Sequence, residues 1–291
     1  MTLLAFMAVA NFTTKLSPEN LFMPELPEVE TIKNGLIDLT GTSVKKTVIR
    51  FPRLRYPLNK SELSKMEGQK VQSVERRAKY LLLVLESGTL IIHLGMSGRI
   101  TLYRDKVPEV QKHDHVDIQF DGYTLRYNDP RRFGCVLYTE RVNDSILLAN
   151  LGPEPFNDEF NAQYLKSKIA NRKTPIKQLI MDNAIVVGVG NIYACESLFM
   201  TKISPLRPGN SLTLRQCNDL VKNIQTVLQN AINAGGSSLR DYKNANGDLG
   251  YFQISHYVYG RANLPCKICN TPIREVRLGQ RNSFFCPECQ K

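Results

Sequence analysis

A long apolar run is the first feature that this sequence lacks. No stretch reaches the roughly 18 to 20 apolar residues that a helix needs to cross a bilayer, so no membrane role is expected. Long internal repeats and low-complexity tracts are missing as well. The 291 residues, 42% of them hydrophobic, therefore predict a soluble globular protein that is long enough for two domains.

An even number of cysteines is also absent. The chain has seven, which excludes a framework in which every cysteine forms a disulfide. Cys135, Cys195 and Cys217 lie scattered in apolar or helical segments, and we expect them to be buried as small side chains. The other four lie together near the C-terminus and need a separate explanation.

Acidic residues are scarce relative to basic ones. The chain has 27 Asp and Glu against 38 Lys and Arg, which gives a net charge of +11 and a pI near 9.3. Such an excess favours a polyanionic partner, because basic side chains that meet phosphates release condensed counterions. Nucleic acid is the first candidate. A basic protein with a well-solvated surface remains the alternative, since charge alone does not separate the two.

Residues 42–141 carry most of the strand signals. Two apolar runs flank the turn ESG, and two more flank the dipeptide Asp121-Gly122, which favours a two-residue hairpin. Ahead of them, PEVETIKNGLIDL has apolar residues at helical spacing, and Pro27 is compatible with a first turn. This half is predicted to be rich in β-strands, with an N-terminal helix.

The prolines of LGPEPFND, residues 151–158, predict a linker, after which the periodicity becomes helical. In LRQCNDLVKNIQTVLQNAINAGG the apolar residues share one helix face, and Gly235-Gly236 ends the pattern. VGVGNIYACESLFM predicts a glycine-rich turn that leads into a helix. The second half is therefore predicted to be a small helical domain with a cysteine-rich tail.

The four C-terminal cysteines have the spacing C-x2-C-x16-C-x2-C, which is typical of a structural zinc site. Two disulfides are the alternative, which a basic tail in an intracellular protein disfavours. Four protein ligands leave zinc no open position, so the metal is expected to hold the tail in shape rather than to activate water. The predicted ligands are Cys266, Cys269, Cys286 and Cys289.

Three other segments are candidates for nucleic-acid contact. LGQRNSFF, between the cysteine pairs, would present Arg281 toward a phosphate, and RRAKYL and DPRRFG carry further arginines. Met96 and Phe133 could enter a base stack as apolar wedges, and the adjacent Gly95 and Gly134 favour loop tips. Each feature also has an ordinary explanation, namely solvated arginines and core positions for the two apolar side chains.

Asn191 follows Gly188 and Gly190 at the start of a predicted helix, where backbone N–H groups can collect a phosphate. The segment is not a Walker loop, because no Gly-Lys-Ser/Thr follows, and it lacks the third glycine of a dinucleotide fingerprint. The ordinary role of an asparagine at this position is to cap the helix.

The segment MPELPEVE, residues 23–30, looks like the start of a protein although 22 residues precede it. Inside a chain, the amide nitrogen of Pro24 is inert. At a free N-terminus it is an amine with a pKa of about 8, so roughly a tenth of it is neutral near pH 7, against less than about one in a thousand for an unperturbed lysine. Such an amine can attack an aldehyde-level carbon and form an iminium ion, with Glu25 and Glu28 placed to move protons. An acidic helix start explains the same residues without chemistry.

From Met23 to Lys291 the sequence resembles bacterial formamidopyrimidine-DNA glycosylase. The resemblance rests on motifs that occur in order: MPELPEVET, RRAKYLLL, IIHLGMSG, KHDHVD, DPRRFG, LGPEP, MDNAIVVGVGNIYACESLF, VYGR and the four-cysteine tail. It implies an α+β fold: a β-sandwich flanked by helices, then a helix-two-turn-helix domain and a zinc-finger β-hairpin, with DNA bound in the cleft between.

The resemblance also implies roles for individual residues. Pro24 matches the nucleophile that attacks C1′ of the damaged nucleotide, Glu25 the acid and base that assists ring opening, and Glu28 a member of the same proton network. The positions that grip phosphates around the flipped nucleotide match Lys79, His93, Asn191 and Arg281. The positions that fill the vacated space match Met96, Arg131 and Phe133, with Arg131 facing the orphaned cytosine.

The implied activity is that of a bifunctional DNA glycosylase and AP lyase of base excision repair. It would remove 8-oxoguanine and formamidopyrimidines through a Schiff base and β,δ-elimination, with one structural zinc ion and no other cofactor. Damaged double-stranded DNA is the expected partner of a monomer located in the cytoplasm with the nucleoid. The endonuclease VIII branch, which acts on oxidised pyrimidines, is the alternative, but its members typically begin Pro-Glu-Gly-Pro-Glu, where this chain has Leu26.

Residues 1–22 depart from the family. Their apolar start followed by AVA faintly resembles a signal peptide but lacks a basic n-region, and we expect translation from Met23 with removal of that methionine. If they stayed attached, the alternative is a non-catalytic zinc protein that binds damaged DNA. A loop around Ala234 to Ser255 is expected to recognise the lesion. The expected units are the extension 1–22, a catalytic domain 23–150, a helix-two-turn-helix domain 151–260 and a zinc finger 261–291.

Overall fold

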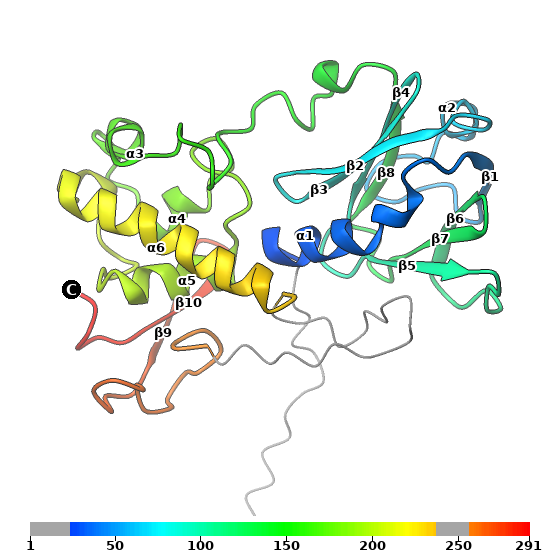
Figure 1. Ribbon diagram of the computed structural model, residues 1–291. Coiled ribbons are helices and arrows are strands. Elements are labelled where there is room, and N and C mark those ends of the chain that lie inside the picture. The colour runs from blue at the N-terminus through cyan, green and yellow to red at the C-terminus, as the bar shows by residue number, and fades with distance from the viewer. Residues whose placement is uncertain (1–23, 237–255) are drawn as a thin grey trace, which may run out of the picture.

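The computed structural model describes residues 24–236 and 256–291. The expectations for the N-terminal extension and for most of the lesion-recognition loop lie outside these residues. Figure 1 shows two lobes, a β-sandwich and a helical part, with helix α1 (Leu26–Gly35) between them. Among the described residues, no helix is both long and apolar enough to span a membrane.

The first lobe is a sandwich of two four-stranded antiparallel sheets. In spatial order, one sheet consists of β1 (Val44–Ile49), β6 (Asp114–Phe120), β7 (Tyr123–Asn128) and β5 (Arg99–Arg104). The other consists of β2 (Val71–Arg77), β3 (Tyr80–Leu85), β4 (Gly88–His93) and β8 (Cys135–Thr139). The predicted hairpin at Asp121-Gly122 is confirmed, and Gly122 supplies the positive φ of +74° that such a turn requires.

Helix α1 joins the two hydrophobic cores. Val29, Ile32 and Leu36 pack into the core of the sandwich, whereas Leu26 belongs to the core of the helical lobe. The helix is shorter than the predicted stretch, because it ends at Gly35 and a 3-10 turn (Ile37–Leu39) continues the chain. The first turn of α1 is therefore inserted at the junction of the lobes. A short α2 (Lys60–Ser64) and a 3-10 turn (Val142–Asp144) complete this lobe.

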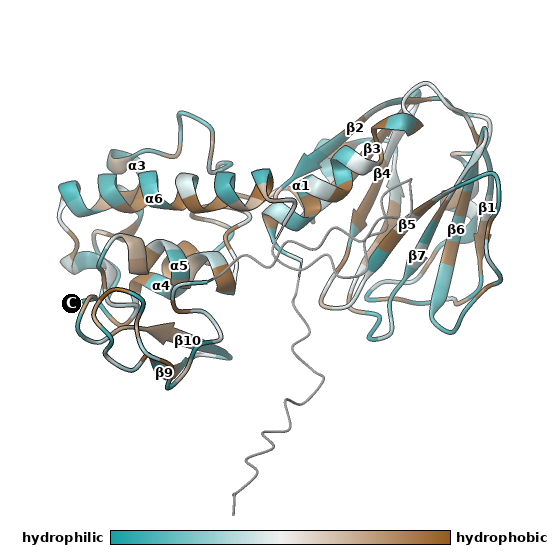
Figure 2. Ribbon diagram, turned by 60° about the horizontal axis from the view of Figure 1, so that its bottom comes forward, coloured by the Kyte–Doolittle hydropathy of each residue, from teal (hydrophilic) through white to brown (hydrophobic). Residues whose placement is uncertain are grey.

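The second lobe contains α3 (Ala162–Ile169), α4 (Ile176–Ile180), α5 (Asn191–Met200), a 3-10 turn (Gly209–Ser211), α6 (Leu214–Asn233) and the hairpin of β9 (Arg274–Leu278) and β10 (Arg281–Phe285). In α6, Leu220, Ile224 and Leu228 are buried, as their spacing predicts. Figure 2 shows α6 as an alternation of hydrophilic and hydrophobic residues. The predicted α+β architecture is confirmed, and so is the burial of the three scattered cysteines, Cys135, Cys195 and Cys217.

Candidate active site

The carboxylate of Glu25 lies at the N-terminal end of α5. It accepts a hydrogen bond from the backbone N–H of Ile192 at 3.0 Å, and only 1% of the residue is exposed. The free N–H groups and the dipole of a helix start both favour an anionic group there. Half-buried Pro24 immediately precedes Glu25, so the start of α1 meets the start of α5 at the junction of the lobes.

Two glycines make this close approach possible. The backbone N–H of Leu26 donates to the carbonyl oxygen of Gly188 at 3.3 Å, and Gly188 has a φ of +82°. A Cβ atom on Gly190 would lie 2.1 Å from the Cδ atom of Glu25, far inside van der Waals contact. The predicted glycine-rich turn is confirmed, and its function in the fold is to let the backbone reach the catalytic candidate.

The structure also brings Glu28 to this point. Its carboxylate accepts hydrogen bonds from the backbone N–H of Glu25 at 2.9 Å and from the hydroxyl of Tyr193 at 2.7 Å. Glu28 is 2% exposed. Sequence reasoning placed Glu28 one helical turn from Glu25 but missed Tyr193. This tyrosine lies inside the motif MDNAIVVGVGNIYACESLF, and no sequence pattern marks it as a partner of Glu28.

Burial shifts the ionisation of Glu25 and Lys79 toward neutrality. Desolvation raises the pKa of Glu25 to about 7, against an opposing effect of the nearby positive charge of Lys79. Burial lowers the pKa of Lys79, which the charges of Glu25 and Glu28 counteract and that of Arg281 reinforces. Four candidates therefore share one electrostatic environment. A carboxyl group with a pKa near 7 can both donate and accept a proton at physiological pH.

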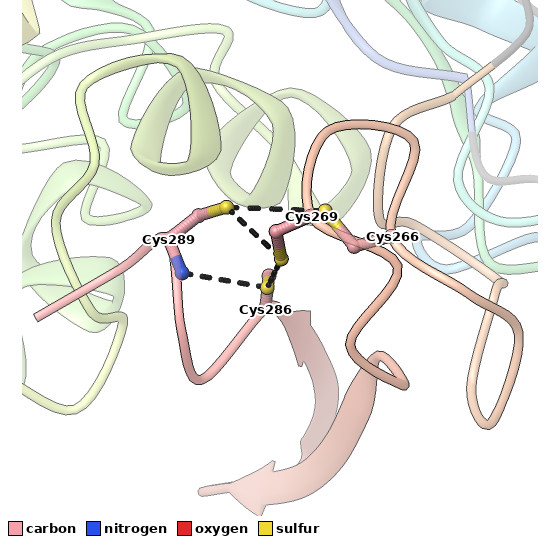
Figure 3. A group of neighbouring side chains, drawn as sticks. All are labelled: Cys266, Cys269, Cys286 and Cys289. Carbon is pink, nitrogen blue, oxygen red and sulfur yellow. Dashed lines mark hydrogen bonds between the residues drawn. The ribbon is translucent and has the colours of Figure 1, made fainter.

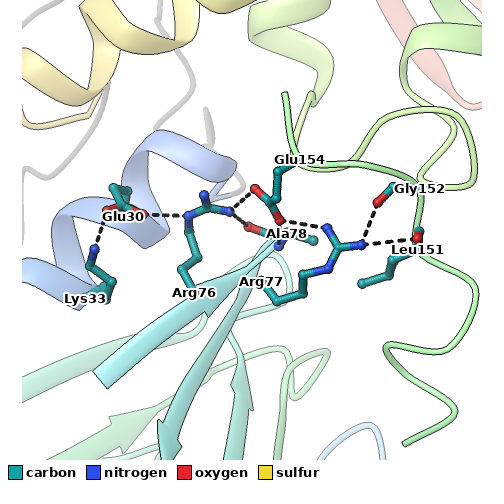
Figure 4. Close-up of polar contacts among 8 residues, drawn as sticks. All are labelled: Glu30, Lys33, Arg76, Arg77, Ala78, Leu151, Gly152 and Glu154. Atoms are coloured by element: carbon teal, nitrogen blue, oxygen red, sulfur yellow. Dashed lines mark hydrogen bonds and ion pairs between the residues drawn. The ribbon is translucent and has the colours of Figure 1, made fainter. Parts of the chain in front are cut away.

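Lys79 extends from the two-residue turn between β2 and β3, and ion pairs hold this turn (Figure 4). Glu154, from the linker, accepts from Arg76 at 2.7 Å and from Arg77 at 2.8 Å. It also accepts from the backbone N–H of Ala78 at 2.7 Å, and Ala78 has a φ of +54°, a strained value for alanine. The linker thus fixes the turn that carries Lys79.

Arg76 is not the nucleic-acid contact that its motif suggested. Its side chain is 10% exposed and also pairs with Glu30 of α1 at 2.6 Å, as Figure 4 shows. The partly buried Arg77 donates to backbone carbonyl groups of the linker in addition to Glu154. Both arginines therefore tie the sandwich, α1 and the linker together, which sequence reasoning could not see because Glu154 is about 77 residues away.

His93 ends β4 and lies close to Lys79. Burial lowers its pKa to about 4, and the positive charges of Lys79 and Arg55 act in the same direction. The backbone N–H of Gly95 donates to its Nδ1 atom at 3.1 Å. A neutral ring whose Nδ1 accepts carries its proton on Nε2, so His93 can donate one hydrogen bond from that atom.

Met96, Arg131 and Phe133 lie in two loops at one end of the sandwich. Phe133 is 48% exposed, so a core position is wrong for this side chain, whereas Met96 is half-buried. The guanidinium carbon of exposed Arg131 lies 4.8 Å from the centre of the Phe133 ring. An exposed aromatic ring with a guanidinium group stacked on it is the kind of side-chain pair that can insert into a base stack.

Asn191 is the first residue of α5, and the N-cap is Gly190, so the capping role considered for Asn191 is wrong. Its side chain is nearly buried: it accepts from the ammonium group of Lys177 and donates to the carbonyl oxygen of Asn282 at 3.0 Å. Lys177 is 1% exposed and also donates to the hydroxyl of Ser283 at 2.6 Å. This lysine, which sequence reasoning missed, fastens the β9–β10 hairpin to α4 and α5.

The four predicted zinc ligands converge (Figure 3). Each offers one sulfur atom, and all four atoms lie within 4.8 Å of one another. Sulfur separations of 3.9 Å between Cys266 and Cys289 and 3.5 Å between Cys289 and Cys269 are near the roughly 3.8 Å edge of a tetrahedron with Zn–S bonds of about 2.3 Å. The backbone N–H of Cys289 points to the sulfur of Cys286 at 3.4 Å. The donor set and geometry fit one structural zinc ion.

Removal of the metal is expected to unfold the hairpin. We expect one zinc ion per chain by metal analysis, and Cys269→Ser or a strong chelator should reduce this content and lower the melting temperature, because zinc binding is coupled to folding. Cys217→Ala is the control, since this buried cysteine lies in α6 away from the cluster. Full zinc content in Cys269→Ser would contradict the assignment.

Three family models match the chain in order. They are the Formamidopyrimidine-DNA glycosylase N-terminal domain at residues 23–136, the Formamidopyrimidine-DNA glycosylase H2TH domain at residues 151–243, and the Zinc finger found in FPG and IleRS at residues 263–291. A formamidopyrimidine-DNA glycosylase of Hydrogenovibrio crunogenus is 51% identical over 272 residues, which cover 92% of this chain and 97% of the relative. One from Methylobacillus flagellatus is 49% identical with the same coverage.

Solved structures give the same picture. The crystal structure of MutM (Fpg) from Thermus thermophilus matches with a TM-score of 0.81 at 39% identity and covers 92% of this chain and 98% of that one. A complex of Lactococcus lactis Fpg with DNA that contains an abasic site matches with a TM-score of 0.83 at 33% identity, covering 92% and 100%. A mutant of the same Fpg in complex with Fapy-dG DNA also reaches 0.83, at 32% identity with the same coverage.

Proposed function

This chain belongs to the formamidopyrimidine-DNA glycosylase family, and we infer that it is a base excision repair enzyme that releases oxidised purines from DNA and cleaves the resulting abasic strand. One observation in the structure carries this inference most directly. The buried carboxyl of Glu25, with a pKa of about 7, stands beside Pro24 and within the field of Lys79 at the junction of the lobes.

We propose that the nitrogen of Pro24 is the nucleophile, in a chain that begins at this residue. The N-terminal family model begins to match at Met23, directly before it. The amine attacks C1′ of the damaged nucleotide, the base departs, and Glu25 protonates the sugar ring oxygen as the ring opens. Glu25, now a carboxylate, removes the C2′ proton, and the electrons of that C–H bond pass toward the iminium as the 3′ phosphate leaves. Loss of the C4′ proton then expels the 5′ phosphate in the same way. Glu28 supports this exchange through its hydrogen bond with the backbone N–H of Glu25.

We propose that the remaining candidates hold the DNA. Lys79, Arg281 and the neutral His93 would contact phosphates around the extruded nucleotide, and Asn191 would contribute from the first turn of α5. Met96, Arg131 and Phe133 would fill the space that the nucleotide leaves. The net charge of +11 supports binding to the backbone of DNA. The zinc ion has a structural role only, since all four of its positions are taken by cysteines.

We propose functional units at residues 23–150, 151–260 and 261–291, which the separate cores of the sandwich and the helical lobe support. We also propose that a monomer acts on double-stranded DNA, in the cytoplasm at the nucleoid where such DNA is found. Size-exclusion chromatography with light scattering, with and without a lesion duplex, tests the monomer.

A comparison of two duplexes tests the activity. We expect strand cleavage of an 8-oxoguanine duplex, with a borohydride-trapped covalent complex, to be faster than cleavage of a matched duplex that carries an oxidised pyrimidine. Faster cleavage of the pyrimidine lesion would instead favour an endonuclease VIII-like enzyme. DNA binding with neither cleavage nor trapping would favour the non-catalytic alternative.

Gly190→Ala is expected to damage this activity severely. A Cβ atom 2.1 Å from Glu25 Cδ must displace the carboxyl, and a misplacement of about 1 Å can cost about 10²-fold in rate. Gly122→Ala is the control for a general loss of stability. Its φ of +74° makes alanine strained there, but no atom lies within 4 Å of the added Cβ, so the substitution causes no steric clash. Single-turnover cleavage rates and melting temperatures of the two variants would be measured. Equal rates for both variants would contradict the steric argument.

A further inference from the structure

Two loops run side by side at one end of the sandwich. The β4–β5 loop leads from the second sheet to the first, and the β7–β8 loop leads back. Because β4 pairs with β8 and β5 pairs with β7, both loops cross the same end of the two sheets. We call them the insertion loops, residues 94–98 and 129–134, because they carry Met96, Arg131 and Phe133.

The backbones of the insertion loops are in direct contact. A Cβ atom on Gly95 would lie 2.5 Å from the carbonyl carbon of Phe133, and Gly95 has a φ of +62°. A Cβ atom on Gly134 would lie 2.3 Å from the carbonyl oxygen of His93. Neither position has room for a side chain, so both must be glycine for the two loops to pack this closely.

The carboxylate of Asp129 joins both insertion loops from inside. The residue is fully buried at 0% exposure. Its Oδ1 atom accepts from the hydroxyl of Ser97, in the β4–β5 loop, at 2.5 Å and from the backbone N–H of Arg131 at 3.3 Å. Its Oδ2 atom accepts from the backbone N–H of Gly134 at 2.9 Å and lies 3.2 Å from the hydroxyl of Tyr127.

The hydroxyl of Ser97 completes a closed set of contacts. It donates to Asp129 and accepts from the backbone N–H of Arg131 at 3.1 Å. The carbonyl oxygen of Asp129 is occupied as well, by the Nε2 atom of His115 at 2.9 Å. The set also reaches one phosphate-binding candidate, because the hydroxyl of Tyr127 lies 3.2 Å from the carbonyl oxygen of His93.

We propose that Asp129 is a positioning residue that locks the insertion loops into one unit, so that Met96, Arg131 and Phe133 enter the DNA together. The proposal rests on the proposed function. A loop that is already ordered loses less conformational entropy on binding, and its side chains keep a fixed spacing when the lesion is extruded. The consequence concerns extrusion and reading of the opposite base, while the chemistry at Pro24 is independent of it.

An aspartate is needed because its two oxygens face only donors. In Asp129→Asn an NH2 group replaces one of the two carboxylate oxygens. This donor then faces another donor, either the hydroxyl of Ser97 or the backbone N–H of Gly134. Asp121→Asn is a matched control, because it changes the net charge by the same one unit. Asp121 lies in an exposed hairpin of the same sandwich, where its carboxylate accepts from the backbone N–H of Ser43. The equal charge change matters because DNA affinity depends on it.

The test compares two substrates that differ in their need for extrusion. With an 8-oxoguanine duplex, Asp129→Asn is expected to lower the single-turnover rate about 10²-fold and to lower the preference for cytosine over adenine opposite the lesion about tenfold. With a single-stranded oligonucleotide that carries an abasic site, strand cleavage should stay at the wild-type rate. Asp121→Asn should match the wild-type protein on both substrates.

Other results would separate the two proposals. Wild-type rate and preference on the duplex in Asp129→Asn would overturn the positioning role, and so would an equal loss on the single strand. A wild-type protein that cleaves neither substrate would overturn the proposed function itself. Ser97→Ala removes a single hydroxyl and keeps the question open if Asp129→Asn does not fold. It should show a smaller loss on the duplex alone, and a loss on both substrates would count against the proposal.

Discussion

A chain that begins at Pro24 is expected to form a borohydride-trapped adduct with an 8-oxoguanine duplex, and a chain that still carries residues 1–22 is not. The physical reason is the nitrogen: a free secondary amine has a lone pair to donate, whereas the amide nitrogen of an internal proline does not. Intact-mass analysis would establish the first residue of each preparation. Trapping by the extended form would rule out Pro24 as the nucleophile.

Pro24→Gly tests the same nitrogen within a mature chain. Glycine offers a primary amine without the ring, so its adduct must be protonated before it can accept electrons, and strand cleavage should fall by about 10²-fold or more. Pro27→Ala is the control, because Pro27 belongs to the first turn of α1 and its replacement leaves the terminal amine in place. A comparable loss in both variants would indicate damage to the helix start rather than to a nucleophile.

The features that sequence alone predicted are those that local spacing encodes. The cysteine pairs, the Asp121-Gly122 hairpin and the apolar face of α6 each depend on residues that are neighbours in the chain, and the structure confirms all three. The glycines before α5 were also visible as a turn. Their steric purpose was not, because Gly188 makes room for Leu26, 162 positions earlier in the chain, and Gly190 makes room for the carboxyl of Glu25, 165 positions earlier.

What sequence reasoning missed depends on distant segments. Lys177 contacts a residue that is 106 positions away, and Glu154 contacts one that is 76 positions away. A lone lysine between apolar residues and an acidic residue in a proline-rich linker have no pattern that marks them as buried partners. The misreading of Arg76 has the same origin: an arginine pair predicts a nucleic-acid contact as readily as an ion-paired joint, until the position of Glu154 is known.

Glu25→Gln is expected to lower the rate of base removal by about 10²- to 10⁴-fold, the usual contribution of a positioned acid or base. The amide keeps the size of the side chain and an oxygen for the N–H of Ile192, so the fold should persist. Glu75→Gln provides a control with the same change of charge on the exposed side of β2. Single-turnover rates with an 8-oxoguanine duplex would be measured, and a rate near that of the control would exclude Glu25 as the acid.

The pH dependence gives a second, independent readout of Glu25. The proposed step needs Glu25 protonated, with a pKa of about 7, and the Pro24 amine neutral, with a pKa of about 8. Below both pKa values the rate should rise with pH, because the neutral fraction of the amine increases. Between the two values the rate should level off, because the protonated fraction of Glu25 falls as the neutral fraction of the amine rises. Above both values the rate should fall, because the amine is fully neutral and only the loss of protonated Glu25 continues. In Glu25→Gln the alkaline fall should disappear, since an amide does not titrate. An alkaline fall that persists in this variant would assign the acid to another group.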